Sequence, residues 1–217
     1  AGVLVLLPLF SRMPGLRSAP NKGKILVYFF SLGLGFMLLE MGFLQKMILY
    51  LSHPIYSAAA VIASFLVFAG VGSQMSGRWK RNIASPVRGA ACVVVIVGLL
   101  YLFLIDSWLS LTQGWNLPLR FLITALTIAP LALAMGHLFP MGLRRVSEAV
   151  PTLVPWSWAV NGFASVLATV SAPLLAMSIG FSRLILAAIL CYVLAGWLSS
   201  SLLRGVETSS AESGDNP

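Results

Sequence analysis

The chain has 217 residues, of which 59% are hydrophobic and only 9% are charged, and its net charge is +8. Because ordinary soluble domains are about 45–50% apolar and about 25% charged, this composition excludes a soluble globular protein and is typical of a membrane protein. The lysines and arginines fall between the apolar runs, so the positive charge does not indicate a nucleic-acid-binding surface.

The predicted elements follow one another as apolar runs. Residues 1–10 are apolar but too few to cross a bilayer, and we expect them to be the end of a preceding, truncated span. A basic link follows at residues 11–24, and a tail rich in Gly, Ser and acidic residues, which we expect to be disordered, occupies residues 205–217. Between them lie six runs long enough to cross a hydrocarbon core of about 30 Å as helices. These runs are residues 25–51, 55–75, 86–108, 117–143, 155–179 and 182–203.

The runs do not alternate polar and apolar residues as barrel strands do, and lipid offers the backbone no hydrogen-bond partner. We therefore expect an all-α fold: a polytopic transmembrane helical bundle with a six-helix membrane domain at residues 25–204, plus the truncated N-terminal span. Of the 14 lysines and arginines, only Lys46, Arg120 and Arg183 fall on one side of these spans. The positive-inside rule then places residues 11–24 and the C-terminal tail in the cytoplasm, in a multi-pass protein of the cytoplasmic (inner) membrane.

One carboxylate lies deep inside a predicted span, in the stretch GLGFMLLEMGFLQK at residues 33–46. This residue, Glu40, is about 22 Å along its helix, and a charge at that depth should face the bundle or a wet cavity and find a partner or a proton. Candidate partners are Lys46, Arg120 and Arg183. Three roles stay open for Glu40: a clamp between two helices, a relay for a proton or a cation, or a group that lines an aqueous cleft.

Two histidines are further candidate site residues. His53 precedes Pro54 in the short link between the first two spans, where it is either a pH-sensitive group or a solvated loop residue. His137 lies in the fourth span, whose prolines and glycines predict either a broken helix beside a cavity or a kinked helix. His137 has no second histidine, cysteine or carboxylate at ligand spacing, so we expect no metal.

Asn161 completes the set of polar candidates, because it begins a stripe that continues every four residues with Ser165 and Thr169 in the fifth span. Interhelical hydrogen bonding and a hydrophilic passage both explain such a stripe. The sequence contains no Ser/His/Asp set, pair of catalytic carboxylates, phosphate-binding loop or metal cluster. We therefore expect the chain to be no enzyme by itself and to need no cofactor.

Three stretches carry a resemblance to a known family. They are LGLGFMLLEMGFLQKMILYLSHPIYSAAAVIASFLVFAGVGS, PLALAMGHLFPMGLRR and VPWSWAVNGFASVLATVSAPLLAMSIGFS. They resemble the C-terminal membrane region of spermidine-synthase-like integral membrane proteins, a multi-helix region of the major-facilitator type. The most specific pieces are the series Glu40, Gln45 and His53-Pro54 and the series from Pro155 to Asn161-Gly162. The resemblance covers about residues 25–200 and implies the membrane architecture, without the soluble aminopropyltransferase domain.

The sequence leaves three possible functions open: a transporter, a structural subunit and part of an enzyme. The first is a transporter-like bundle that handles a small cationic or polyamine-like solute near Glu40. The alternative is a non-catalytic accessory or anchoring subunit of a larger complex, and a third is the membrane part of an enzyme whose catalytic domain is on another chain or segment. The expected partners are the lipid bilayer and other membrane or soluble protein chains, with no nucleic acid.

Overall fold

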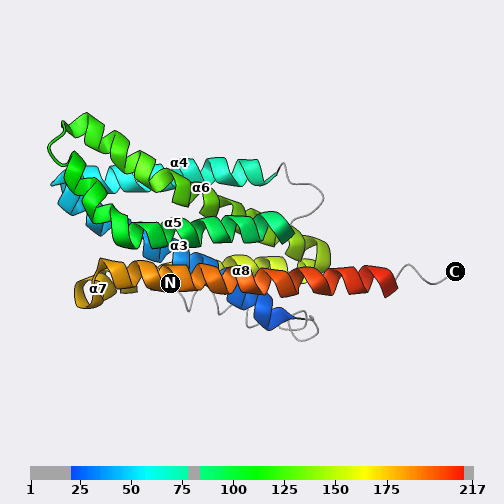
Figure 1. The fold of residues 1–217 in the computed structure, drawn as a ribbon. Helices are drawn as coiled ribbons and strands as arrows, with labels where there is room; N and C mark the ends of the chain where they lie inside the picture. Colours follow the sequence, from blue (N-terminus) through cyan, green and yellow to red (C-terminus); the bar gives the residue numbers. More distant parts are fainter. Residues whose placement is uncertain (1–20, 78–83, 213–217) are drawn as a thin grey trace.

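The computed structural model describes residues 21–77 and 84–212, and the chain in these ranges folds entirely into helices and their connections (Figure 1). The helices are α3 (Lys22–Leu51), α4 (Pro54–Ser76), α5 (Ala84–Thr112), α6 (Leu117–Ala149), α7 (Val154–Ile179) and α8 (Phe181–Glu212), with a 3-10 turn at Pro151–Leu153. All six are long and apolar enough to cross a membrane. The prediction of an all-α, six-span helical bundle is therefore confirmed for the described residues.

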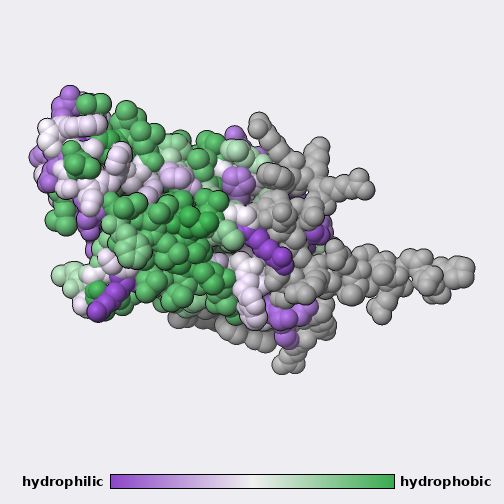
Figure 2. Space-filling view, viewed as in Figure 1, coloured by the Kyte–Doolittle hydropathy of each residue, from purple (hydrophilic) through white to green (hydrophobic). Residues whose placement is uncertain are grey.

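The surface of the bundle agrees with membrane embedding. Figure 2 shows a broad apolar face across the middle of the helices, with hydrophilic residues gathered toward the two ends. Large side chains on this surface are exposed, among them Phe103 and Met177 at 79% and 85%. Lipid rather than water is the solvent that such a belt requires.

Some predicted segments lie partly or wholly outside the described residues. The truncated span at residues 1–10 and most of the basic link at 11–24 belong to the undescribed part, as does the basic connection at 78–83. The described chain enters α3 at Lys22, within that link. At the other end, α8 continues to Glu212, so the helix covers the first residues of the segment expected to be a disordered tail.

Helix α3 is the central element, because it packs against α4, α6, α7 and α8. Gly33 faces α7, and Gly35, two residues later and so on nearly the opposite side of the helix, faces α8. Helices α7 and α8 thus hold α3 between them. The single residue Gly180 joins these two helices at φ 84°, a left-handed conformation that favours glycine.

Helices α4 and α6 form the other close pair, through a reciprocal contact of small residues. A side chain at Gly72 of α4 would collide with the backbone of Leu133 of α6, and a side chain at Gly136 of α6 would collide with the backbone of Ala69 of α4. Each helix thus places a glycine against the other helix's main chain. This is the small-residue mode by which membrane helices approach closely without a hydrophobic driving force.

Helix α6 is continuous through Pro130 and Pro140, so the prolines of the fourth span do not break it. Pro130 cannot donate a hydrogen bond to the carbonyl four residues earlier, and its ring crowds that turn of the helix. In the affected turn, the Thr127 carbonyl accepts a hydrogen bond from the Tyr101 hydroxyl of α5. Farther along, the Leu138 carbonyl accepts one of 2.8 Å from the Tyr28 hydroxyl of α3. Both carbonyls lie within one turn of a proline, so neighbouring helices add hydrogen bonds to α6 close to Pro130 and Pro140.

Candidate intramembrane polar site

Glu40 lies in the middle of the central helix and is only 7% exposed. Phe36 and Phe43, one turn before and one turn after it on α3, both pack edge-to-face against Phe65 of α4, at ring-centroid distances of 5.7 and 5.9 Å. The turns of α3 on either side of Glu40 therefore carry aromatic rings that pack on α4. Among the residues that the structure describes, none forms a hydrogen bond or an ion pair with Glu40.

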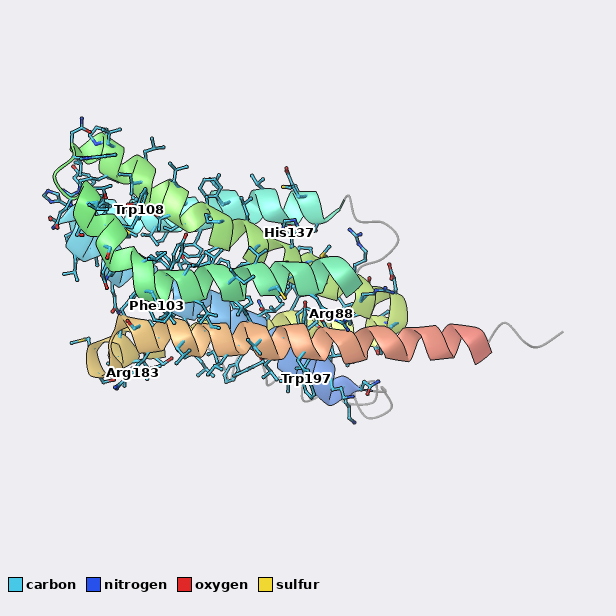
Figure 3. All side chains as sticks on the ribbon, in the orientation of Figure 1. Arg88, Phe103, Trp108, His137, Arg183 and Trp197 are labelled. Atoms are coloured by element: carbon cyan, nitrogen blue, oxygen red, sulfur yellow. The ribbon has the colours of Figure 1, made fainter. Side chains whose placement is uncertain are left out.

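The three cations predicted as partners of Glu40 make other contacts. Lys46 forms an ion pair with Asp106 of α5. Arg120 places its guanidinium 4.8 Å from the ring centroid of Tyr50. Arg183 is exposed at the end of the bundle near the α7–α8 connection (Figure 3). None of the three neutralises the Glu40 carboxylate within the described part of the chain.

One end of the bundle carries the short connections 52–53, 113–116 and 180, and we call it the short-loop end. At this end, Lys46 contacts residues of two other helices. Its ammonium meets the Asp106 carboxylate of α5 and lies 5.1 Å from the ring centroid of Phe181 of α8. The Lys46 side chain is 18% exposed and that of Asp106 is 71% exposed, so the pair is open to solvent on one side. A pair of this kind positions helices more than it stabilises them.

A second polar contact at the short-loop end joins α3, α5 and α6. The Tyr50 and Thr112 hydroxyls are 2.8 Å apart, and both residues are buried. The Arg120 guanidinium lies over the Tyr50 ring, and its Nε and Nη2 atoms are buried with no hydrogen-bond partner among the described residues. A cation over the face of an aromatic ring is attracted by the ring quadrupole, which accounts for the inward position of Arg120.

The remaining predicted residues are spread over the bundle rather than gathered around Glu40. Gln45 is half-buried on α3. His53 is exposed at the start of α4, with its ring 5.5 Å from that of Tyr56. His137 is half-buried and its Nδ1 lies 2.7 Å from the carbonyl oxygen of Leu133 in the same helix. No group of three potential metal ligands occurs among the described residues.

Asn161 and its stripe lie in the contact between α7 and α3. The Asn161 backbone carbonyl and side-chain oxygen are so close to Gly33 that a Cβ would not fit there. The Ser165 hydroxyl donates to the Asn161 carbonyl at 2.9 Å, and the Thr169 hydroxyl donates to the Ser165 carbonyl at 2.8 Å. Each hydroxyl also has an acceptor on α3: the Ser165 hydroxyl lies 3.5 Å from the Gly33 carbonyl oxygen, and the Thr169 hydroxyl lies 3.4 Å from the Met37 sulfur. The stripe therefore joins α7 to α3 by hydrogen bonds as well as bonding to the α7 backbone.

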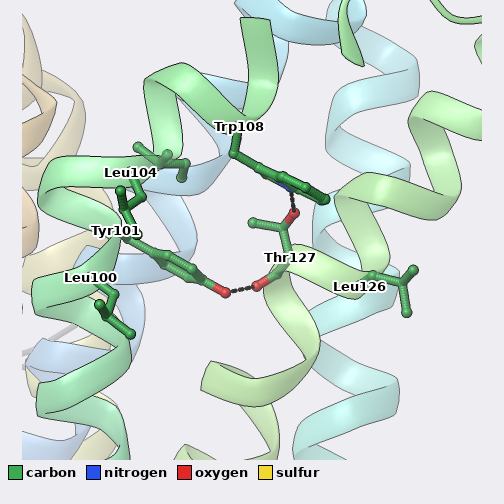
Figure 4. A pocket seen from close by; sticks show the side chains of 7 residues that line it. Leu100, Tyr101, Leu104, Trp108, Leu126 and Thr127 are labelled. Carbon is green, nitrogen blue, oxygen red and sulfur yellow. Dashed lines mark hydrogen bonds between the residues drawn. The ribbon is translucent and has the colours of Figure 1, made fainter. Parts of the chain in front are cut away.

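A groove between α5 and α6 has a volume of about 340 Å³ and is almost wholly apolar. Figure 4 shows its polar centre, where the Tyr101 hydroxyl bonds to the Thr127 carbonyl and the Trp108 indole N–H donates to the Thr127 hydroxyl at 3.2 Å. Leu100, Leu104 and Leu126 form the walls. Since its polar groups satisfy one another, this groove suits a hydrocarbon chain.

The sequence analysis did not single out Asp106, Tyr50 or Thr112. Asp106 lies near the end of the third apolar run, and an acidic residue at that position could have predicted an ion pair at the membrane boundary. Tyr50 and Thr112 have no such signal, because their meeting depends on how α3 and α5 are rotated against each other.

Comparison of the chain with protein-family models, with curated protein sequences and with solved structures finds no match. The chemistry of the site therefore has to be argued from the arrangement itself. The arrangement offers one buried carboxylate on the central helix, with an aromatic ring one turn before it and one turn after it, and a polar cluster that joins helices at the short-loop end. A carboxylate in such a place can exchange a proton or hold a cation.

Proposed function

We propose that the bundle is a transporter-like membrane protein that binds a small cation or a cationic solute, with Glu40 as the group that holds it. One observation carries the proposal: Glu40 is buried on the central helix with no partner among the described residues. An ionised carboxylate in an apolar interior is costly by several kcal/mol unless a proton or a cation neutralises it. A bound cation would neutralise the carboxylate and so offset this cost.

Polyamines are the first solutes to test. Their ammonium groups complement a buried carboxylate, and the surrounding rings of Phe36, Phe43 and Phe65 can attract a cation through their faces. The resemblance to the membrane region of spermidine-synthase-like proteins supports the same choice. On this proposal, the contacts of Lys46 and Arg120 hold the short-loop end together while the solute is bound.

The experiment is uptake of radiolabelled spermidine and putrescine into proteoliposomes with an imposed pH gradient. Glu40→Gln keeps the size of the side chain and removes its charge, so we expect flux to fall to the level of empty liposomes. Glu148→Gln is the matched control, because Glu148 is exposed near the end of α6 and the substitution removes the same charge. Equal flux in the wild type and Glu40→Gln would remove Glu40 from the proposal.

A second measurement applies when no tested solute is taken up. A protonated carboxyl in an apolar site has its own carbonyl absorption, so the infrared spectrum of the purified protein should contain a band that disappears in Glu40→Gln and persists in Glu148→Gln. Spermidine or another bound cation should weaken this band by displacing the proton. A spectrum identical in all three proteins and insensitive to cations would contradict a proton- or cation-binding Glu40.

The alternative is a non-catalytic accessory or anchoring subunit. The observation that favours it is α7, which packs mainly on α3 and leaves large side chains such as Trp158, Val170 and Leu174 exposed along its length. A helix of another membrane protein can cover such a face as readily as lipid. Purification in a mild detergent should then recover stoichiometric partner chains, including any separate catalytic chain, whereas a monodisperse monomer counts against this alternative.

A further inference from the structure

A second groove lies between α5 and α8, toward the end opposite the short-loop end. It has a volume of about 360 Å³ and is lined almost wholly by apolar atoms. The two helices approach closely on either side of it: Gly98 of α5 lies against Ile189 of α8, and Gly196 of α8 lies against Ala91 of α5. The groove runs along the surface from Ile96 toward the start of α5.

The groove ends at a cation. Arg88, in the second turn of α5, is one of its lining residues and is exposed. Among the described residues, no carboxylate or other group forms an ion pair or hydrogen bond with Arg88. Trp197 of α8 lines the same end, 71% exposed (Figure 3).

The length of α5 places this end at the level of lipid headgroups. From Arg88 to Thr112, helix α5 rises through 24 residues, which is about 36 Å. The hydrocarbon core is about 30 Å thick, and about 40–45 Å with its polar interfaces. With Thr112 at one boundary of the bilayer, Arg88 therefore lies beyond the hydrocarbon core at the other, and its guanidinium reaches the phosphate layer. An exposed tryptophan beside it is typical of the same layer.

We propose that the α5–α8 groove binds one molecule of an acidic phospholipid, with an acyl chain in the groove and the phosphate on Arg88. The apolar walls match a hydrocarbon chain, and the Arg88 guanidinium, which has no partner among the described residues, matches a phosphate, to which arginine presents two parallel N–H donors. Basic pockets between transmembrane helices recognise anionic headgroups on the same physical grounds.

The dimensions favour a lipid chain over a helix of another protein. From Arg88 to Ile96 the groove follows eight residues of α5, about 12 Å, and beyond it the contact of Gly98 with Ile189 closes the space between the helices. A helix with side chains is about 10–12 Å wide and would lie over this groove rather than in it. One acyl chain can enter it.

The test measures retained lipid by native mass spectrometry of the full chain, in detergent supplemented with either phosphatidylglycerol or phosphatidylcholine of the same acyl chains. We expect one molecule of phosphatidylglycerol to be retained by the wild type and phosphatidylcholine to be retained at least five-fold less. Arg88→Gln should lower phosphatidylglycerol retention about five- to ten-fold, whereas Arg183→Gln, which removes an exposed arginine at the other end of α8, should leave it unchanged.

A second variant tests the acyl-chain seat. Val193 lines the groove and is exposed, so Val193→Phe fills the space without disturbing the helix contacts. It should lower the retention of the lipid even though Arg88 is intact. The proposal is overturned if Arg88→Gln and Arg183→Gln retain phosphatidylglycerol equally, if the two lipids are retained alike by the wild type, or if Val193→Phe retains lipid as the wild type does.

Discussion

The reciprocal contact between α4 and α6 predicts how two neighbouring glycines respond to the same substitution. A Cβ at Gly72 would stand 3.0 Å from the Leu133 carbonyl carbon and 3.2 Å from its Cα, and closer still to its oxygen. These are backbone atoms, so they cannot rotate away as a side chain would. At Gly70, two residues earlier on the same helix, a Cβ has no neighbour within 4 Å.

The magnitude follows from this geometry. Gly72→Ala forces α4 and α6 apart, and a gap of about 0.5–1 Å forfeits a quarter to a half of the dispersion energy of the contacts that it opens. Overpacking of this kind costs about 1–3 kcal/mol. Gly70→Ala adds the same methyl group without a clash, and alanine favours a helix over glycine by up to about 1 kcal/mol. We therefore expect the two variants to differ in stability by about 1–4 kcal/mol, with Gly70→Ala the more stable.

The assay is denaturation of each purified variant by SDS in mixed micelles, followed by circular dichroism and tryptophan fluorescence. Gly136→Ala should resemble Gly72→Ala, because its methyl group would meet the backbone of Ala69. The double variant should lose less than the sum of the two single losses, since the first methyl group already separates the helices. Equal midpoints for Gly72→Ala and Gly70→Ala would refute the close approach of these helices.

Two contacts between α3, α5 and α6 give further predictions. Tyr101→Phe removes the donor to the Thr127 carbonyl and should lower the stability by about 0.6–1.7 kcal/mol in the same SDS titration. Tyr56→Phe, at an exposed tyrosine, is the control and should not lower the stability measurably. Equal losses in the two variants would contradict the assigned hydrogen bond. A double-mutant cycle of Lys46→Met and Asp106→Asn should give a coupling of about 0.2–1 kcal/mol that weakens in 1 M salt, since the Asp106 side chain is 71% exposed. A coupling above about 3 kcal/mol that salt does not change would instead indicate a buried pair.

The fold could be predicted from the sequence because each span is an apolar run of sufficient length. The ends of the helices were less predictable, since a run ends at its last apolar residue while the hydrogen-bonded ladder continues. Helix α6, for example, passes through Arg144 and Arg145 to Ala149, six residues beyond the predicted end at residue 143. The two prolines inside α6 left a broken and a kinked helix both open, and the structure has one continuous helix with donors from neighbouring helices bonded close to the prolines.

The candidate site could be predicted only in part, for a geometric reason. An acidic residue in an apolar helix is expected to avoid lipid, and Glu40 is buried. Which residues meet around it depends on how each helix is rotated about its axis relative to its neighbours. A single sequence does not reveal this relative rotation. Lys46 was considered as a partner of Glu40 because it lies on the same side of the predicted spans, yet it pairs with Asp106, sixty residues away.

The central position of α3 has a consequence for the synthesis of this protein. Helices α7 and α8, which enclose α3 on two sides, are translated after α3 to α6. At about 5–20 residues per second, the residues from 52 to 212 take on the order of 10–30 s to translate. During that interval α3 lacks the two helices that pack on its Gly33 and Gly35 faces. A chain that stops before α7 therefore leaves both of these faces of α3 open to lipid or to other membrane helices.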